Sequence, residues 1–226
     1  MKYFLDSADF DVIRLALGKY PLNGVTTNPT ILARDLPADI TLIDGLTKIR
    51  QLTDGLLMFV QATAHDSDGM IRDARKICST LGGALSIKLP ATPDGFTAAK
   101  QLTADGISVT MTAVYSTSQA MLAGACGADF AAPYISHLDN MSLDGAQIAS
   151  EMAQQLEYHE MPTQVLAASF RTASQVERCI AGGVGAVTVT YEMLDVLASH
   201  PGTLNEVASF DAKWAARFGK NVADLI

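Results

Sequence analysis

The sequence predicts an α/β protein that folds as a (β/α)8 TIM barrel with an extra C-terminal helix. Short apolar runs alternate with longer amphipathic ones along the whole chain, which is typical of βαβ units around a parallel sheet. The short runs recur eight times within about two hundred residues, close to the smallest size of a (β/α)8 barrel. The composition suits one well-filled core, because 49% of the 226 residues are hydrophobic and only 18% are charged.

The expected strands are short and apolar, and the expected helices are amphipathic. The strand candidates are residues 3–5, 24–27, 57–61, 85–88, 109–112, 130–134, 165–168 and 186–189. The helix candidates are residues 9–19, 67–81, 94–105, 116–125, 143–159 and 173–181. Several begin at a residue that can cap a helix, as Asp94 or Ser116 would. Others end at a glycine, as Gly106 and Gly182 would.

A doubly wound open sheet is the competing fold for this alternation. Against it, no Gly-rich phosphate loop of the dinucleotide or P-loop type follows any expected strand. In a barrel, the active site lies at the carboxyl ends of the strands.

The C-terminal segment differs from the repeats before it. Residues 204–218 carry apolar side chains at helical spacing, among them Phe210, Trp214 and Phe218. These aromatics would cover either their own barrel or a neighbouring subunit. We therefore divide the chain into a catalytic barrel, residues 1–203, and a C-terminal helical extension, residues 204–226, that packs on a neighbour.

Composition and charge exclude several classes of function. The net charge of −8 argues against nucleic acid or an anionic membrane as a partner. Three cysteines without metal-type spacing and four scattered histidines argue against structural zinc and a disulfide scaffold. The N-terminus shows no signal peptide and no apolar run is long enough to span a bilayer, so the expected location is cytoplasmic.

Lys88 is the most informative residue, because it interrupts the apolar run 84–90 of an expected buried strand. Burial removes the hydration of an ammonium and lowers its pKa, so that part of it becomes a neutral amine. Such an amine attacks carbonyl groups, which is how Schiff-base enzymes prepare their nucleophile. The alternative is a lysine at the strand end whose head reaches water.

Polar residues recur at the ends of the other expected strands, where a barrel would gather them around Lys88. They are Asp6, Thr26, Asn28, Gln61, Thr112, Tyr134, Ser169 and Arg171. Each has a structural alternative: Asp6 could cap the next helix, Asn28 could form a turn, and Thr112 could be β-branched filling. Together they supply an acid, hydroxyl donors, a water-binding group and an anion clamp, which a reactive lysine needs.

Four segments resemble the small transaldolase-like family of class I aldolases, and within it the fructose-6-phosphate aldolases most. They are Thr26-Thr27-Asn28-Pro29-Thr30, Ile87-Lys88-Leu89-Pro90, Thr112-Ala113-Val114-Tyr115-Ser116 and Ala167-Ala168-Ser169-Phe170-Arg171. The resemblance runs from Tyr3 to the C-terminal helix and implies the barrel fold.

The resemblance also implies roles for the strand-end residues. Lys88 would be the Schiff-base lysine and Asp6 the acid/base group, while Thr26, Asn28 and Ser169 would bind the substrate. Gln61, Thr112 and Tyr134 would hold a catalytic water. No metal or other cofactor is implied, because the iminium supplies the electron sink. The family's pentameric rings, often paired into decamers, imply a homo-oligomer.

The implied reaction is reversible cleavage of fructose 6-phosphate or a similar ketose into dihydroxyacetone and an aldehyde such as glyceraldehyde 3-phosphate. Transaldolases of the family resemble each other in a Glu on strand three and a Phe on strand six, where this chain has Gln61 and Tyr134. A phenol can order the water that protonates the enamine, so the aldolase is favoured. The alternative is a transaldolase that moves the dihydroxyacetone unit between sugar phosphates.

The anion site departs from the family pattern, because His137 stands where those aldolases place an arginine. Arginine is a permanent bidentate clamp, whereas a histidine of ordinary pKa is only partly charged at neutral pH. Arg171, where many aldolases have lysine, would then carry the anion. A sulfonate has one charge, so 6-deoxy-6-sulfofructose is a further donor candidate, with glyceraldehyde 3-phosphate as the acceptor. The Thr110-Met111 pair also departs from the family and would reshape the pocket floor.

Two other functions compete with this interpretation. A non-catalytic sugar-phosphate binding protein would not need the set Lys88, Asp6 and Tyr134. An aldolase of the deoxyribose-phosphate type would carry a second lysine on a strand near the nucleophile. No expected strand other than that of Lys88 contains a lysine.

Overall fold

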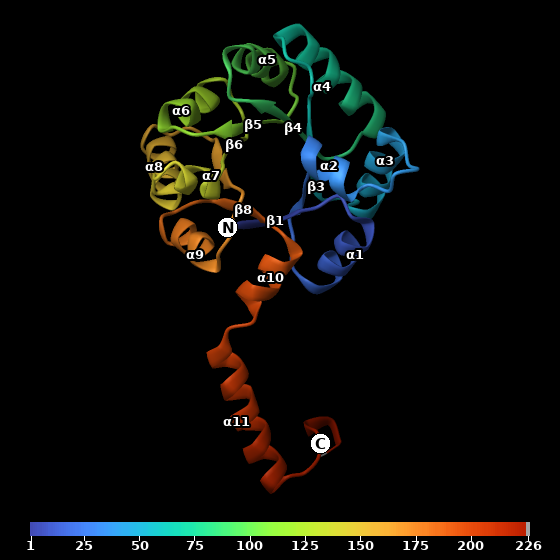
Figure 1. Ribbon diagram of the computed structural model, residues 1–226, viewed down its shortest axis with the longest axis vertical. Coiled ribbons are helices and arrows are strands. Elements are labelled where there is room, and N and C mark those ends of the chain that lie inside the picture. The colour runs from blue at the N-terminus through green and yellow to red at the C-terminus, as the bar shows by residue number, and fades with distance from the viewer. Residues whose placement is uncertain (225–226) are drawn as a thin grey trace. The chain divides into compact units, whose positions relative to one another are not determined.

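The computed structural model describes residues 1–224, and the chain divides into two compact units, the first from Met1 to Tyr191 and the second beginning at Glu192. In the first unit, eight parallel strands form a closed barrel in sequential order, and β8 pairs back with β1 (Figure 1). The predicted (β/α)8 barrel is confirmed, as is the additional C-terminal helix.

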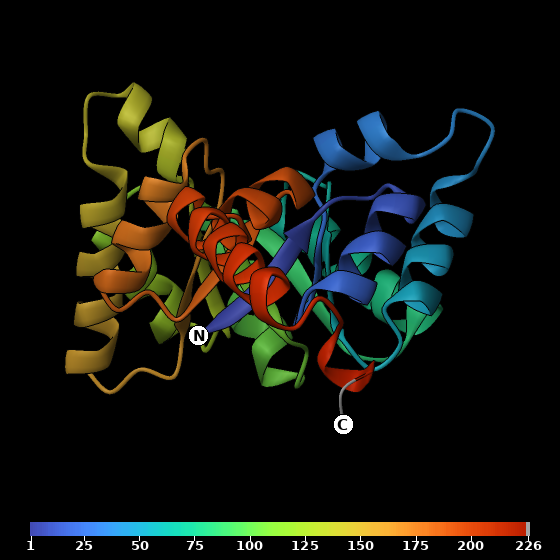
Figure 2. The same cartoon turned by 90° about the horizontal axis from the view of Figure 1, so that it is seen from below.

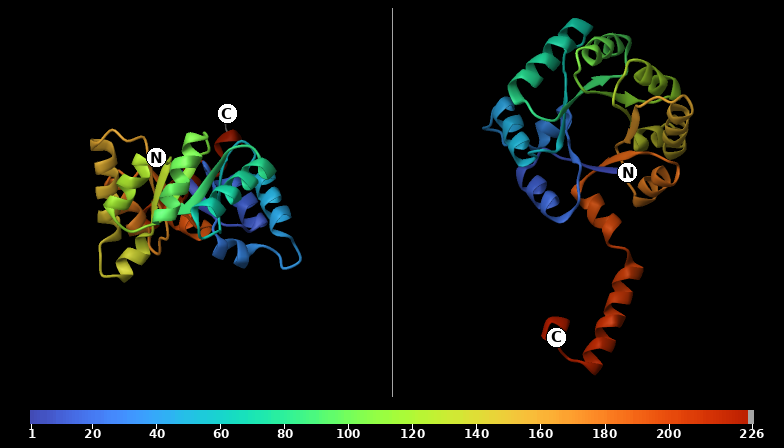
Figure 3. Two further views of the ribbon diagram at one scale, coloured as in Figure 1. Left: turned by 90° about the horizontal axis from the view of Figure 1, so that it is seen from above. Right: turned by 180° about the vertical axis from the view of Figure 1, so that it is seen from behind.

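Strands and helices alternate throughout the barrel, with the helices around the strands (Figure 3). The strands are β1 (Lys2–Asp6), β2 (Gly24–Thr26), β3 (Leu57–Gln61), β4 (Leu85–Pro90), β5 (Val109–Val114), β6 (Phe130–Pro133), β7 (Gln164–Ala167) and β8 (Ala186–Val189). The barrel helices are α1 (Phe10–Lys19), α2 (Pro29–Asp35), α3 (Leu42–Leu52), α4 (Ser67–Leu81), α5 (Pro93–Ala104), α6 (Thr117–Ala125), α7 (Ile135–Asn140), α8 (Gly145–Tyr158) and α9 (Ala173–Ala181). After them come α10 (Tyr191–Ala198), α11 (Pro201–Arg217) and a 3₁₀ turn at Val222–Asp224.

One predicted helix start is wrong. The side chain of Thr92, not that of Asp94, caps α5 by accepting the N–H of Gly95 at 3.2 Å. Pro93 follows the cap at the first helical position, where a missing N–H costs nothing and the fixed φ suits the helix. Asp94 lies in the first turn instead, where a carboxylate favours the positive end of the helix dipole.

Other predicted boundaries are confirmed. Ser116 caps α6 by accepting the N–H of Gln119 at 3.3 Å. Gly182 ends α9 as its C-cap, and Gly106 follows α5 with a φ of 77°, in the left-handed region that favours glycine.

The short helices α2 and α7 were not predicted, because six or seven residues are too few to show a helical period. Both lie at the carboxyl ends of the strands, on opposite sides of the barrel mouth (Figures 1 and 2). They therefore form two walls above the strand ends.

Aromatic residues fill the interior of the barrel. The rings of Phe4, Phe59 and Phe130 meet edge to face, with centroids 5.0 to 6.1 Å apart. Side chains two positions apart on a strand share a face, so Asp6 and Gln61 lie one layer above Phe4 and Phe59. The polar residues at the strand ends thus lie directly above an apolar core layer.

The described part of the second unit is helical. The expected helix 204–218 is found within α11, which begins earlier, at Pro201, after the N-cap His200. The Trp214 ring lies 4.5 Å from that of Phe218, and its Nε1 donates to the carbonyl of Lys220 at 2.7 Å. Across residues 1–224 we find no helix of the length and apolarity needed to cross a membrane.

Candidate active site

A cavity of about 600 Å³ opens at the carboxyl ends of the strands. Most of the residues predicted for the site line it, namely Asp6, Asn28, Gln61, Lys88, Tyr134, His137 and Ser169. Thr26 and Thr112 are buried directly behind this lining. The strand ends therefore converge as a barrel requires.

Lys88 is held inside the barrel with only 6% of its surface exposed. Its Nζ donates to the carbonyl oxygen of Thr27 at 2.8 Å. Burial lowers the pKa of Lys88, and the carboxylate of Asp6 partly opposes this by favouring the ammonium. A larger fraction of Lys88 is consequently the neutral, nucleophilic amine at a given pH than of an exposed lysine.

Asp6 ends β1 and faces the same cavity as Lys88. Burial raises the pKa of its carboxyl group, while the charge of Lys88 and the hydroxyl of Thr26 lower it. The Thr26 hydroxyl donates to Oδ1 of Asp6 at 2.7 Å and lies 2.5 Å from the hydroxyl of Thr188. Asp6 does not cap α1, because Asp9 does so. A raised pKa suits a group that must take up and return a proton.

Tyr134 lines the cavity directly after the end of β6. Its hydroxyl lies 2.9 Å from that of Thr112 in β5, so the two form a polar pair. Burial raises the pKa of the Tyr134 phenol, which keeps it protonated and able to donate a hydrogen bond. Gln61 pairs in register with Lys88 and brings an amide to the same layer.

Asn28 and Ser169 line the cavity from loops after β2 and β7. The Asn28 side chain accepts the N–H of Ile31 at 2.9 Å, so it caps α2 as well as facing the cavity. Ser169 has a φ of 61°, an uncommon backbone conformation for a residue with a side chain. The Ser136 hydroxyl, 2.8 Å away, bonds that of Ser169 and fixes its direction.

Of the two residues predicted for the anion site, one lines the cavity and the other does not. His137, on α7, lines the cavity, whereas Arg171 is not among the lining residues. The backbone N–H of Arg171 donates to Oε1 of Gln175 at 2.7 Å, which holds the start of α9. Arg34 lines the cavity instead, at the end of α2, with its Nε 2.5 Å from Oδ1 of Asp35.

Sequence reasoning missed further lining residues, among them Arg34, Thr188 and Thr190. Thr188 lies in β8 and Thr190 directly follows it, and this spacing of two residues at a strand end was a signal that could have identified them. Arg34 had no such signal, because the helix that carries it was not predicted.

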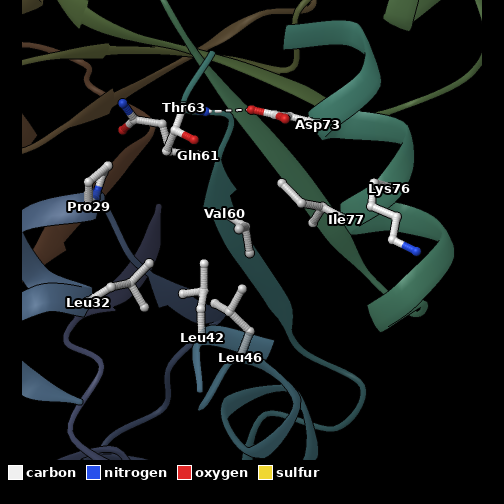
Figure 4. Close-up of a pocket in the computed structure, with 10 residues that line it drawn as sticks. All are labelled: Pro29, Leu32, Leu42, Leu46, Val60, Gln61, Thr63, Asp73, Lys76 and Ile77. Atoms are coloured by element: carbon white, nitrogen blue, oxygen red, sulfur yellow. Dashed lines mark hydrogen bonds between the residues drawn. The ribbon is translucent and has the colours of Figure 1, made fainter. Parts of the chain in front are cut away.

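A second cavity of about 340 Å³ lies between α2, α3 and α4 (Figure 4). Pro29 and Gln61 border both cavities. Leucine and isoleucine side chains line much of the second one, and the carboxylate of Asp73 accepts the N–H of Thr63 at 2.9 Å beside them. Gln61 therefore borders a cavity with many polar side chains and a second, mainly apolar one.

The expectation that no other strand contains a lysine is wrong, because β1 begins at Lys2. Lys2 pairs with Ala186, the first residue of β8, and its Nζ lies 5.4 Å from the centre of the Phe130 ring. It is thus at the amino end of the barrel, remote from Lys88. Among residues 1–224, no three His, Cys, Asp or Glu side chains are placed to hold a metal ion together.

The chain matches the family model described as transaldolase/fructose-6-phosphate aldolase over residues 3–224. It is 36% identical to a probable transaldolase of Hyphomonas neptunium, over 95% of this chain and 98% of that one. It is 33% identical to a probable fructose-6-phosphate aldolase of Streptococcus pneumoniae (95% and 96%). A probable transaldolase of Desulforapulum autotrophicum is 32% identical, over 97% of this chain and all of that protein.

Among solved structures, the thiamine phosphate pyrophosphorylase of Pyrococcus furiosus superposes with a TM-score of 0.61. The superposition covers 84% of this chain and 85% of that one, at 16% identity. At this identity the likeness concerns the barrel fold alone. The match to the family model extends over almost the whole chain, and we conclude that the protein belongs to the transaldolase/fructose-6-phosphate aldolase family.

Proposed function

We propose that this protein is a class I aldolase that cleaves fructose 6-phosphate, or a similar ketose, into dihydroxyacetone and an aldehyde. The observation that carries the proposal is the buried pair of Lys88 and Asp6 at the mouth of the barrel. Burial lowers the pKa of the amine and raises that of the carboxyl group. These shifts suit a nucleophile and a proton carrier that work near neutral pH.

The reaction begins when the neutral amine of Lys88 adds to the ketone carbon of the substrate. Loss of water gives an iminium, which withdraws electrons from the C3–C4 bond. As that bond breaks, its electron pair forms the enamine, and Asp6 takes the proton of the C4 hydroxyl. The aldehyde leaves with C4 as its new carbonyl carbon.

Release of the second product requires a proton at C3 and a water at the iminium carbon. Tyr134, Thr112 and Gln61 would hold the water that delivers this proton, and Asp6 would return its own proton to the water pool. Hydrolysis of the iminium then frees dihydroxyacetone and restores the Lys88 amine. Asn28, Ser169 and Thr26 would bind or orient the substrate hydroxyls.

The test is borohydride reduction in the presence of fructose 6-phosphate without an acceptor, followed by intact and peptide mass measurement. A three-carbon adduct on Lys88 is the expected result, because cleavage leaves only the dihydroxyacetone unit on the amine. A six-carbon adduct alone would mean that the Schiff base forms without cleavage. With no adduct, 6-deoxy-6-sulfofructose is the next donor, and a lack of adduct with both would contradict the proposal.

The second candidate is a transaldolase, which would pass the dihydroxyacetone unit to another aldehyde, including from 6-deoxy-6-sulfofructose to glyceraldehyde 3-phosphate. Two relatives of this chain bear the name probable transaldolase, which favours this candidate. The Tyr134 hydroxyl favours the aldolase, because it can hold a water beside the enamine.

We expect Tyr134→Phe to slow the release of free dihydroxyacetone by roughly tenfold, the size of one lost hydrogen bond to a reacting water. Transfer to an added aldehyde should fall much less. The measurement is the ratio of released to transferred dihydroxyacetone. An unchanged ratio would mean that the phenol does not direct the enamine to water.

We further propose that Arg171 holds the anionic end of the substrate together with His137. Arg171→Ala should then raise the KM for glyceraldehyde 3-phosphate about 10- to 100-fold, the range of a charge-assisted hydrogen bond, and change that for glyceraldehyde much less. Arg34→Ala is the comparison, because Arg34 lines the cavity and Arg171 does not. If only the Arg34 variant discriminates between the two aldehydes, Arg171 is structural.

We also propose that the protein is a homo-oligomer in the cytoplasm, a pentamer or decamer. Within its unit, α11 exposes apolar side chains along its length, among them Leu204, Phe210 and Trp214. A subunit that left them in water would carry an unusual apolar surface. Light scattering of the purified protein measures the oligomeric state, and a monomer would contradict the proposed homo-oligomer.

A further inference from the structure

Tyr115 contacts His137 at the edge of the catalytic cavity. Its hydroxyl oxygen lies 3.1 Å from Nδ1 of His137. The ring of Tyr134 packs against both, at 5.2 Å from His137 and 6.2 Å from Tyr115. The imidazole is therefore held by a hydrogen bond on one nitrogen and by an aromatic ring on its face or edge.

The backbone around Tyr115 is anchored in a way that directs its side chain. The register of β5 against β6 shifts between Thr112 and Val114, and Ala113 between them has a φ of 55°. Such bulges re-aim the residues that follow them. The N–H of Tyr115 then donates to Oε1 of Gln119 at 2.8 Å, and the Gln119 amide donates to the carbonyl of Ala91.

The helix that carries His137 is anchored as well. The N–H groups of Ile135 and Ser136 donate to the carbonyls of Ala168 and Ser169, each at 2.9 Å. The first turn of α7 therefore continues the pairing of β6 with β7. Two anchored backbones thus bring the phenol and the imidazole together, and the contact does not depend on a mobile loop.

We propose that Tyr115 is a positioning residue, whose O–H donates to Nδ1 and so places the proton of neutral His137 on Nε2. The nitrogen that carries the proton in a neutral imidazole is decided by the hydrogen bond on the other nitrogen. Nε2–H is then the donor that His137 offers to an oxygen at the far end of the acceptor aldehyde. This inference rests on the proposed aldolase function and specifies the acceptor end of its substrate.

The consequence is a preference in substrate charge. A neutral N–H donor suits an acceptor whose distal oxygen belongs to a hydroxyl or a singly charged group, so binding of a phosphate dianion would depend on the permanent cation proposed above, Arg171. The charged groups that share the cavity with His137 are Asp6, Lys88 and Arg34. Arg34 is paired with Asp35, and Lys88 is committed to the Schiff base.

The first experiment measures the protonated nitrogen by ¹⁵N NMR of the histidine rings, without ligand, at about pH 8.5, well above the ordinary pKa of histidine. In the wild type, His137 should show a protonated Nε2 and a bare Nδ1. In Tyr115→Phe, which removes only the hydroxyl, the Nδ1–H form should increase. A wild type with Nδ1 protonated, or a variant with unchanged shifts, would overturn the proposal.

The second experiment compares acceptors in the synthesis direction. Tyr115→Phe and His137→Ala should each raise the KM for glyceraldehyde about 3- to 10-fold, the effect of one neutral hydrogen bond, and that for the two-carbon glycolaldehyde far less. The double variant should be no worse than His137→Ala, because both changes remove the same interaction. Additive effects would show that Tyr115 does not act through His137.

Three variants complete the design. His137→Gln keeps an N–H donor and should recover part of the affinity, whereas His137→Arg should favour the phosphorylated acceptor over glyceraldehyde. Tyr158→Phe is the control, because Tyr158 also packs edge to face on a histidine, His159 at 5.1 Å, but does not line the cavity. A failure of the aldolase proposal would appear as absent turnover in the wild type, while the NMR result would still test the tautomer.

Discussion

We expect Lys88→Met to abolish aldol turnover and to leave the fold intact. Lys88 is the one lysine among the described residues that line the catalytic cavity, and the guanidinium of Arg34 does not form a Schiff base. Methionine matches the length of the lysine stem and suits the apolar surroundings, so the core keeps its packing. Turnover should fall below detection, and the circular dichroism spectrum should be unchanged.

The matched control for Lys88→Met is Lys100→Met, on the exposed side of α5. That change removes a lysine of ordinary environment and should leave turnover as it is. Measurable turnover in Lys88→Met would exclude the Schiff-base mechanism. If Lys88→Met binds the ketose as tightly as a wild type that shows no turnover, the protein is a sugar-phosphate binding protein.

We expect Asp6→Asn to lower kcat by about 10²- to 10⁴-fold, the usual contribution of a positioned general acid or base. The asparagine keeps the shape of the side chain and can still accept the hydroxyl of Thr26, so binding should change little. The control is Asp11→Asn, on the exposed face of α1 beside Arg14. An Asp6→Asn variant with wild-type kcat would assign the proton transfer to another group.

The same variant should move the pH dependence of Schiff-base formation in a defined direction. The Asp6 carboxylate raises the pKa of Lys88 against the larger lowering caused by burial. With its charge removed, the pKa of Lys88 falls further, so the neutral amine is present at lower pH. The rising limb of the borohydride trapping rate should therefore shift to lower pH than in the wild type. A shift to higher pH would mean that Asp6 does not act on Lys88 through its charge.

Much of the fold could be predicted because its signals are local. The expected bounds 57–61 and 186–189 coincide with β3 and β8, since apolar runs bounded by turn residues are properties of short segments. The cap of α5 was assigned wrongly because Thr92 and Asp94 are both good N-cap residues, and only the position of Pro93 between them decides.

The strand-end residues of the candidate site could be predicted from the sequence, whereas the arginine that lines the cavity could not. Asp6, Gln61 and Lys88 were found because each ends or interrupts an apolar run. Arg34 was missed, and Arg171 is not among the residues that line the cavity, because the direction of a side chain after the strand is decided by short helices and loops. The contact between Tyr115, which follows β5, and His137, in α7, joins segments that are separate in the sequence, so no local pattern predicts it.

The sequence by itself determined the barrel, the family and the residue types available for catalysis, because periodicity and motifs depend on residues that are close together in the sequence. Only the tertiary structure decided which of these side chains share a cavity, which lysine is buried, and which arginine lines the cavity. The physical reason is that desolvation and charge coupling act between groups brought together by barrel closure. Lys88 is one of many lysines along the chain, and its burial opposite Asp6 is what separates it from the others.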